Sequence, residues 1–277
     1  MKKIDLGLKA SSDPEQIKDR LQYQPNVFEF YTAENDFTGD GLKRLAYGID
    51  QVKDAGINHI VLHHPMRYRE YFTELLTPEA KLPELYRFIE QSSLDLLQLA
   101  YDKNVQVLIH GSYSRQTAEF LSLYPDLEHA EEYVFKRLDH FKDLGKEHVM
   151  FENSISPVFY YGDETLDAKI LAHDYRLAFD TSHCFIKWQG DNAKLMTALA
   201  HLKQNIVHYH LVDSLGKTHD SLELGKGKIV WKNVLPLLNE DATNIFEVVL
   251  KDQTDALEQV NSFNYLKTLE EKLDVNI

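Results

Sequence analysis

Eight short apolar runs alternate with helix-like stretches along this chain of 277 residues. The runs are rich in β-branched and aromatic residues, and the stretches between them carry apolar residues at helical spacing and end on glycines such as Gly56 and Gly145. Runs without polar alternation are typical of parallel strands that helices cover on both faces. The pattern therefore predicts an α/β fold. The length and the number of repeating units favour a single (β/α)8 barrel domain over residues 1–277 rather than an open sheet.

The predicted strands share short length and apolar character, and they are Ile4 to Lys9, Val27 to Tyr31, His59 to His64, Val105 to His110, His148 to Glu152, Tyr175 to Asp180, Asn205 to Leu211 and Asn244 to Leu250. The predicted helices share the helical spacing, and they are Pro14 to Leu21, Gly41 to Ala55, Pro83 to Asp102, Thr117 to Leu144 as a pair around Pro125, Glu164 to Ala172, Asn192 to Lys203, Trp231 to Asn239 and Ala256 to Leu273.

Composition narrows the class of protein. Apolar residues make up 43% and charged residues 27% of the chain, as in globular proteins with ample core material. The formal net charge of −14 disfavours a sequence-independent grip on nucleic acid, which depends on Lys and Arg facing phosphates. No stretch approaches the roughly 18 apolar residues of a membrane span, and the start lacks an apolar signal core. We therefore expect a cytoplasmic protein without a membrane partner, which agrees with the lone Cys184.

Each of the last four predicted strands carries, at or near its carboxyl end, a side chain that commonly binds metal ions. These four side chains belong to Glu152, Asp180, His210 and Glu247. The carboxyl ends of parallel barrel strands meet at one rim, so these side chains are expected to lie together. A charged side chain at the end of a buried strand is costly unless it is paired or bound to a metal. Three carboxylates and one imidazole suit a divalent ion such as Mn, Mg, Co or Zn.

Three motifs in the second half of the chain resemble those of a known superfamily. They are Phe179-Asp180-Thr181-Ser182-His183, His210-Leu211-Val212-Asp213-Ser214 and Leu224-Gly225-Lys226-Gly227-Lys228-Ile229. Together they look like the motifs of the xylose isomerase-like metal barrels, which include sugar isomerases, ketose 3-epimerases, inositol-pathway enzymes and endonuclease IV. The resemblance spans most of the chain and is specific to the superfamily rather than to one reaction.

The resemblance implies a role for each matching residue. Glu152, Asp180, His210 and Glu247 take the places of the shared metal ligands, and His183 takes the place of a histidine that touches substrate in the epimerases. We favour a metal-dependent isomerase or epimerase acting on a small sugar or sugar phosphate. There Glu152 and Glu247 would transfer protons through a metal-stabilised enediolate, and His183 would steady the oxyanion. The predicted substrate-binding residues are Lys217, His219, Tyr113 and Trp188.

Histidines near two earlier strand ends keep a second function open. His64 and His110 end the third and fourth predicted strands, where similar histidines of endonuclease IV bind an additional zinc beside the glutamate that corresponds to Glu152. Together with His183 they would hold a second or third ion, and the chain would be a zinc phosphodiesterase acting on abasic DNA. Adjacent strand residues point to opposite faces, so only one of His63 and His64 faces the site, and we favour His64.

One departure weighs against the nuclease. Counted back from Gly225, His219 and Ser221 stand where the nuclease has an Asp-x-His pair. A third reading from another class is a barrel that binds a small ligand without catalysis, which predicts a protein free of metal. The sequence leaves the oligomeric state open, a homo-oligomer included.

Overall fold

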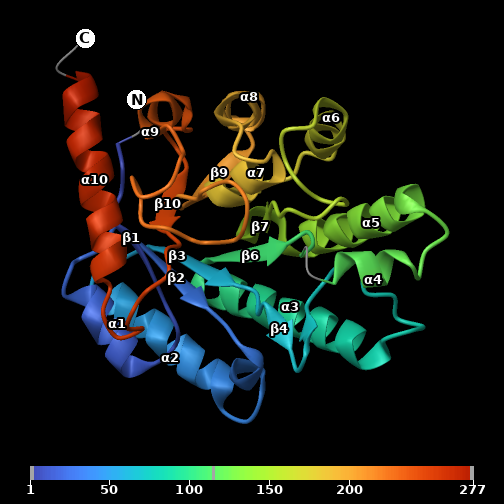
Figure 1. Cartoon of the computed structure of the whole chain (residues 1–277). Coiled ribbons are helices and arrows are strands. Elements are labelled where there is room, and N and C mark those ends of the chain that lie inside the picture. The colour runs from blue at the N-terminus through green and yellow to red at the C-terminus, as the bar shows by residue number, and fades with distance from the viewer. Residues whose placement is uncertain (1–2, 114–115, 275–277) are drawn as a thin grey trace.

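The computed structural model describes residues 3–113 and 116–274, and a sheet of eight parallel strands forms its centre (Figure 1). In spatial order around the sheet the strands are β1 (Gly7–Ala10), β2 (Val27–Tyr31), β3 (His59–His63), β6 (Gln106–His110), β7 (Val149–Glu152), β8 (Leu177–Asp180), β9 (Ile206–Leu211) and β10 (Thr243–Phe246). This order follows the chain, and the sheet curls into a nearly closed barrel, as the alternating pattern predicts.

Helices connect successive strands and cover the outside of the barrel (Figure 1). They are α1 (Pro14–Leu21), α2 (Gly41–Asp54), α3 (Pro83–Lys103), α4 (Thr117–Leu121), α5 (Leu127–Gly145), α6 (Glu164–Ala172), α7 (Thr181–Lys187), α8 (Asn192–Leu202), α9 (Trp231–Val234) and α10 (Leu257–Asp274), with short 3-10 turns at Glu34–Phe37, Lys146–His148 and Leu235–Leu237. The predicted helices are confirmed to within a residue or two, except that the one after β9 is shorter and breaks into α9 and a 3-10 turn.

Strand β1 begins at Gly7, three residues after the predicted start at Ile4, and three features at the carboxyl-end rim also differ from the prediction. Helix α7 begins directly after β8, with Asp180 as its N-cap, because the side chain of Asp180 accepts the backbone N–H of His183 at 2.6 Å. A small antiparallel hairpin, β4 (Arg67–Tyr68) and β5 (Tyr71–Phe72), follows β3. Strand β10 ends at Phe246, four residues before the predicted end at Leu250. All three lie at the rim, where segments are too short to show a clear hydrophobic period.

The seam between the first and last strands closes through a side chain. The amide of Asn244 on β10 donates to the carbonyl oxygen of Asp5 at 3.0 Å and accepts the Asp5 N–H at 3.4 Å. Beside this bridge Gly7 lies so close to β10 that an added Cβ would overlap the carbonyl oxygen of Asn244. The absence of a side chain at Gly7 therefore permits the approach of β10 that closes the barrel.

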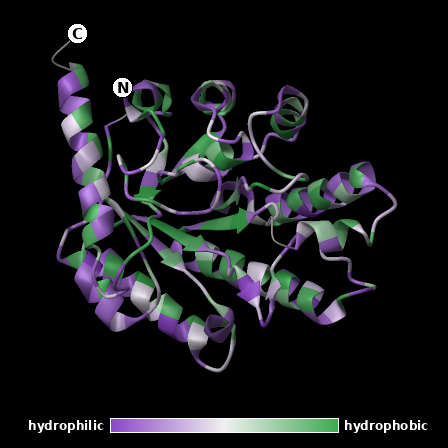
Figure 2. Cartoon of the chain, in the orientation of Figure 1, coloured by the Kyte–Doolittle hydropathy of each residue, from purple (hydrophilic) through white to green (hydrophobic). Residues whose placement is uncertain are grey.

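The hydrophobic core has two parts. The larger part fills the space between the strands and the surrounding helices, and the smaller part lies inside the barrel, where it consists of Val61, Leu108, Met150 and Ala178. Figure 2 shows the same division, with hydrophobic strands inside helices that carry hydrophilic residues on their outer sides. None of the helices in the described ranges combines the length and apolar character needed to cross a membrane.

Candidate metal centre

One set of inward-facing side chains stands at the carboxyl ends of five neighbouring strands. Side chains alternate between the two faces of a strand, so the residues two positions beyond the interior core also point inward. In β3, β6, β7 and β8 the inward-facing residue lies two positions after Val61, Leu108, Met150 and Ala178, respectively. Strand β9 contributes a fifth inward-facing residue. The inward-facing residues of this upper layer are His63, His110, Glu152, Asp180 and His210, all buried.

Four of the predicted ligands form one group. Glu152, Asp180, His210 and Glu247 each offer a ligand atom, and these atoms all lie within 4.8 Å of one another. Nδ1 of His210 is 2.6 Å from Oε2 of Glu247 and 3.2 Å from Oε1 of Glu152. The structure thus brings together the quartet that the strand ends suggest.

A second group shares Glu152 with the first. His63, His110 and Glu152 also place ligand atoms within 4.8 Å of one another. Oε2 of Glu152 is 2.9 Å from Nε2 of His110 and 3.6 Å from Nε2 of His63, while its Oε1 faces His210. The two oxygens of one carboxylate therefore face two different sets of ligands.

These groups fit a divalent metal. Among the described residues, both carboxylate oxygens of Glu152, Oδ2 of Asp180, Nδ1 of His210 and Nε2 of His63 are buried without a hydrogen-bond partner. Buried polar atoms are normally satisfied, so carboxylate oxygens and imidazole nitrogens that converge at ion-pair distance without well-directed hydrogen bonds suit a common cation. The two oxygens of Asp180 also have different roles. Oδ1 accepts a hydrogen bond at the N-terminus of α7, whereas Oδ2 has no hydrogen-bond partner and is available to a metal ion.

The electrostatics of the cluster favour positive charge at its centre. Burial alone would raise the pKa of the Glu152 carboxyl, but the imidazoles of His110 and His210 hold that pKa well below its usual range. Burial alone would lower the pKa of His210, yet the carboxylates of Glu152, Glu29 and Glu247 raise it well above its usual range. The same carboxylates would attract a bound divalent cation.

The prediction that His64 faces the site is wrong. Strand β3 ends at His63, and it is His63 that points toward Glu152 and His110. The ring of His64 turns outward to α3, where its Nε2 lies 2.8 Å from Oγ of Ser92. The strand register decides the choice, because neighbouring residues of a strand face opposite sides of the sheet.

His183 lies beside the two groups and pairs with His219. Its Nδ1 is 2.9 Å from the carbonyl oxygen of Asn153, which only accepts, so Nδ1 carries the proton. Nε2 of His183 then accepts from Nε2 of His219 at 2.8 Å, and Oγ of Ser221 lies 3.2 Å from Nδ1 of His219. His219 and Ser221, the two residues that depart from the nuclease pattern, thus form a hydrogen-bonded chain that ends on His183.

Solved structures similar to this one share its barrel over nearly the whole length. A D-tagatose 3-epimerase-like protein matches with a TM-score of 0.72 at 16% identity, covering 98% of both chains. D-psicose 3-epimerase from Clostridium cellulolyticum H10 matches with a TM-score of 0.67 at 13% identity, over 96% of this chain and 98% of that one. Endonuclease IV from Thermus thermophilus matches with a TM-score of 0.62 at 17% identity, over 95% of this chain and 98% of that one.

The chain has the xylose isomerase-like barrel fold. This confirms the fold that the motifs suggest. No protein-family model matches the sequence, and no curated protein does. At these identities the likeness shows the shared fold, and the chemistry of this barrel follows from its own residues.

A cavity of about 150 Å³ opens above the two candidate ligand groups of the barrel. Tyr113, predicted to bind substrate, lines it and packs against the ring of His110 with centroids 4.4 Å apart. His219 and Glu247 also line it. The described residues that surround the cavity are Met66, Arg67, Phe72, His110, Tyr113, Ser154, Ile155, His183, His219 and Glu247.

Two predicted substrate-binding residues lie elsewhere. Trp188 is turned away from the cavity, because its indole N–H donates to the carbonyl oxygen of Tyr161 at 2.9 Å and its ring packs on Gly162. Lys217 is exposed on the loop after β9 and is not among the described residues that line the cavity. Neither is placed to contact a ligand in this cavity.

Sequence reasoning missed a polar layer below the ligands. Lys9, Glu29 and His208 project into the barrel from β1, β2 and β9, on the side opposite the small apolar core. A signal for the first two existed, since each is a lone charged residue within an otherwise apolar strand, and such a residue is costly unless paired. Asn153 was also missed; its amide joins the ends of β7 and β8 through two hydrogen bonds to the backbone of Asp180, at 2.8 and 3.0 Å.

Glu74 secures the segment that carries Tyr113. Its Oε2 accepts the backbone N–H of Tyr113 at 2.7 Å, and its Oε1 lies 3.4 Å from the hydroxyl of Thr117. Burial raises the pKa of the Glu74 carboxyl to about 8, and the two hydrogen bonds oppose that rise only partly.

We expect Glu74 to make stability depend on pH. A carboxyl whose pKa is higher in the folded than in the unfolded protein binds more protons when folded, so its contribution is greatest at low pH and is lost as the pH rises toward about 8. Relative to Glu74→Gln, the free energy of unfolding of the wild type should fall by a few kcal/mol between about pH 5 and 8.5, at about 1.4 kcal/mol per unit of pKa shift. Urea unfolding at several pH values measures this. Parallel pH profiles for the two proteins would contradict it, and the exposed Glu84→Gln is the control.

Proposed function

We propose that this barrel is a metal-dependent hydrolase of phosphate esters. The observation that carries the proposal is the sharing of Glu152 between the quartet and the group of His63 and His110. A carboxylate that faces two ligand sets suits a pair of ions, and bound metal would supply Lewis-acid stabilisation of the charge that develops on a phosphoryl oxygen. Endonuclease IV and a Thermus thermophilus protein soaked with ZnCl2 are among the structures with this fold.

The residues of the cavity assign the remaining roles. Arg67 is the cation among the described residues of the cavity wall, and its guanidinium lies over the ring of Phe72 at 4.3 Å from the centroid, placed to bind an anionic substrate. His219 and His183 both line the cavity as a hydrogen-bonded pair, with His219 between Ser221 and His183, so this pair is the proton donor we assign to a leaving oxygen. The small cavity and the net charge of −14 favour a small phosphate ester over a DNA duplex.

The isomerase or epimerase favoured from the sequence is the second candidate function. It is supported by Glu247, which borders the cavity and belongs to the quartet, and by the several epimerases among proteins of this fold. For that reaction Glu152 would have to move protons to and from a substrate. Glu152 is fully buried below the cavity and faces imidazoles on both sides, which favours a ligand role for it.

His63→Asn separates the two functions. It removes the second group and leaves the quartet unchanged. For the hydrolase, metal analysis should show about two ions in the wild type and about one in the variant, and hydrolysis of bis(p-nitrophenyl) phosphate should fall by on the order of 10²-fold or more. For the epimerase, exchange of ketose protons with solvent deuterium should persist in both proteins.

The matched control is His64→Asn, which changes the neighbouring histidine that contacts Ser92 instead of the centre. It should keep both ions and the full hydrolytic rate. A wild-type protein that holds two ions, leaves phosphodiesters, phosphomonoesters and abasic DNA uncleaved, and exchanges ketose protons would overturn the proposed hydrolase.

A further inference from the structure

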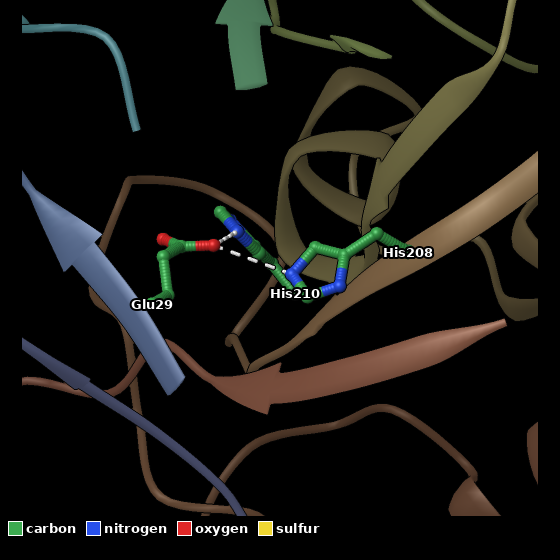
Figure 3. A group of neighbouring side chains, drawn as sticks. All are labelled: Glu29, His208 and His210. Carbon is green, nitrogen blue, oxygen red and sulfur yellow. Dashed lines mark hydrogen bonds and ion pairs between the residues drawn. The ribbon is translucent and has the colours of Figure 1, made fainter. Parts of the chain in front are cut away.

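A buried charged layer lies directly below the metal-ligand layer. Glu29 and His208 are fully buried, and they approach each other across the interior from β2 and β9 (Figure 3). Because His208 and His210 are two residues apart on one strand, both rings point to the same face, and both reach the same oxygen of Glu29. Nε2 of His210 is 2.9 Å and Nε2 of His208 is 3.3 Å from Oε2 of Glu29.

Lys9 completes this layer and joins it to the ligands. Its ammonium is 3.0 Å from Oε1 of Glu29 and also forms an ion pair with Oε1 of Glu247. Glu247 in turn contacts Nδ1 of His210 through its other oxygen, at 2.6 Å. One lysine and one glutamate thus hold two members of the metal quartet from below.

The group of Glu29, His208 and His210 has the composition of a metal site, but its surroundings favour hydrogen bonding. An ion there would share Glu29 with the ammonium of Lys9, 3.0 Å from the same carboxylate, and the two cations would repel each other. Nδ1 of His208 is already 2.6 Å from the hydroxyl of Thr243. The polar neighbours of Glu29 in the described structure, Lys9 and the two histidines, therefore act as donors to its carboxylate.

The carboxylate of Glu29 determines which nitrogen of His210 carries a proton. An ionised carboxylate accepts hydrogen bonds and donates none, so Nε2 of His210 carries a proton where it meets Glu29. Once the Nδ1 proton has left, as it must before a metal can bind there, the imidazole keeps its proton on Nε2 and has its lone pair on Nδ1. Nδ1 is the atom that faces Glu152 and Glu247.

We propose that Glu29, held in place by Lys9 and His208, is a positioning residue that fixes the tautomer and ring orientation of His210 so that Nδ1 is presented to the metal centre. Such partners of metal-bound histidines typically change metal affinity by about 10- to 100-fold. The inference rests on the metal centre of the proposed function but is independent of the reaction catalysed there.

The test measures metal binding rather than turnover. Metal-free wild type and Glu29→Gln are titrated with Zn²⁺ and with Mn²⁺ by calorimetry, and circular dichroism checks that both are folded. We expect the same number of ions per chain in both proteins and an affinity about 10- to 100-fold lower in Glu29→Gln at the position that His210 serves. His148→Asn, which removes a buried histidine bonded to the Val105 carbonyl and remote from the ligands, should bind metal as the wild type does.

The outcomes separate the two proposals. Equal affinities in wild type and Glu29→Gln would refute the positioning role alone, and so would the loss of one whole ion from the count, which would make Glu29 a ligand. A wild type that binds no divalent metal would remove the proposed function as well. If Glu29→Gln does not fold, His208→Gln takes its place with a smaller expected loss of affinity, because His208 contacts Glu29 and leaves the His210 contact intact.

Discussion

Glu152→Gln is expected to abolish metal binding at both groups and to lower catalysis by on the order of 10³-fold or more, whichever reaction the centre performs. Glu152 is the residue common to the two groups, with one oxygen facing His110 and His63 and the other facing His210. A neutral amide removes the negative charge and places an N–H donor among nitrogen ligands. Elemental analysis should find fewer than about one ion per chain, against about two in the wild type.

The same variant should lose its stabilisation by metal. An ion that binds only the folded protein adds about 2.7 kcal/mol at a free concentration roughly 100 times its Kd, so added Zn²⁺ should raise the melting temperature of the wild type and leave that of Glu152→Gln nearly unchanged. Glu90→Gln, which breaks an ion pair with Arg137 outside the centre, is the control for loss of a partly buried carboxylate. Retention of two ions by Glu152→Gln would show that the two groups do not depend on their shared ligand.

Gly7→Ala should destabilise the barrel more than other single-methyl additions. The new Cβ would overlap the carbonyl oxygen of Asn244, which belongs to the backbone and cannot turn aside as a flexible side chain does. Overpacking in a core costs roughly 1–3 kcal/mol, and a clash with backbone at the seam should reach or exceed about 3 kcal/mol. Urea unfolding followed by circular dichroism measures the loss.

Gly39→Ala is the comparison for that experiment. Gly39 has a φ of +53° and no heavy atom within 4 Å of an added Cβ, so alanine there meets backbone strain without a clash, at a cost of about 1 kcal/mol. A loss at Gly7→Ala no larger than that at Gly39→Ala would mean that β10 shifts freely, and that the seam does not depend on the close approach of the two strands.

The quartet could be found from the sequence because each member follows an apolar run on its own strand. Glu152, Asp180 and His210 end or nearly end strands of mainly apolar and aromatic residues, and Glu247 follows β10 directly. Parallel strands of a barrel end at one rim, so sequence position alone implied proximity. The same reasoning placed His110 at the rim, but it could not choose between His63 and His64. That choice depends on where β3 begins and on which face of the strand meets the interior.

Contacts between side chains across the barrel could not be predicted from the pattern of single strands. Lys9 and Glu29 come from the first two strands and His208 comes from β9, far along the chain, and the period of two says only that each side chain points inward or outward. Trp188 is the opposite case. Its place in the segment after β8 suggested that it lines the cavity, but it lies at the end of α7, where its hydrogen bond to the carbonyl oxygen of Tyr161 holds it away from the cavity. Loop side chains follow local packing, which no strand pattern encodes.

The sequence by itself determined the (β/α)8 architecture and the proximity of the four strand-end side chains, because both follow from hydrophobic periodicity along single segments. Only the tertiary structure decided that Glu152 joins a second group through His63 and His110, and that Lys9 and Glu29 support His210 and Glu247 from below. Those relations depend on the closure of the sheet, which brings β1 next to β10 and sets the distances across the interior. The curvature and stagger of a barrel arise from all strands together, so the pairing of side chains within it is a property of the whole fold.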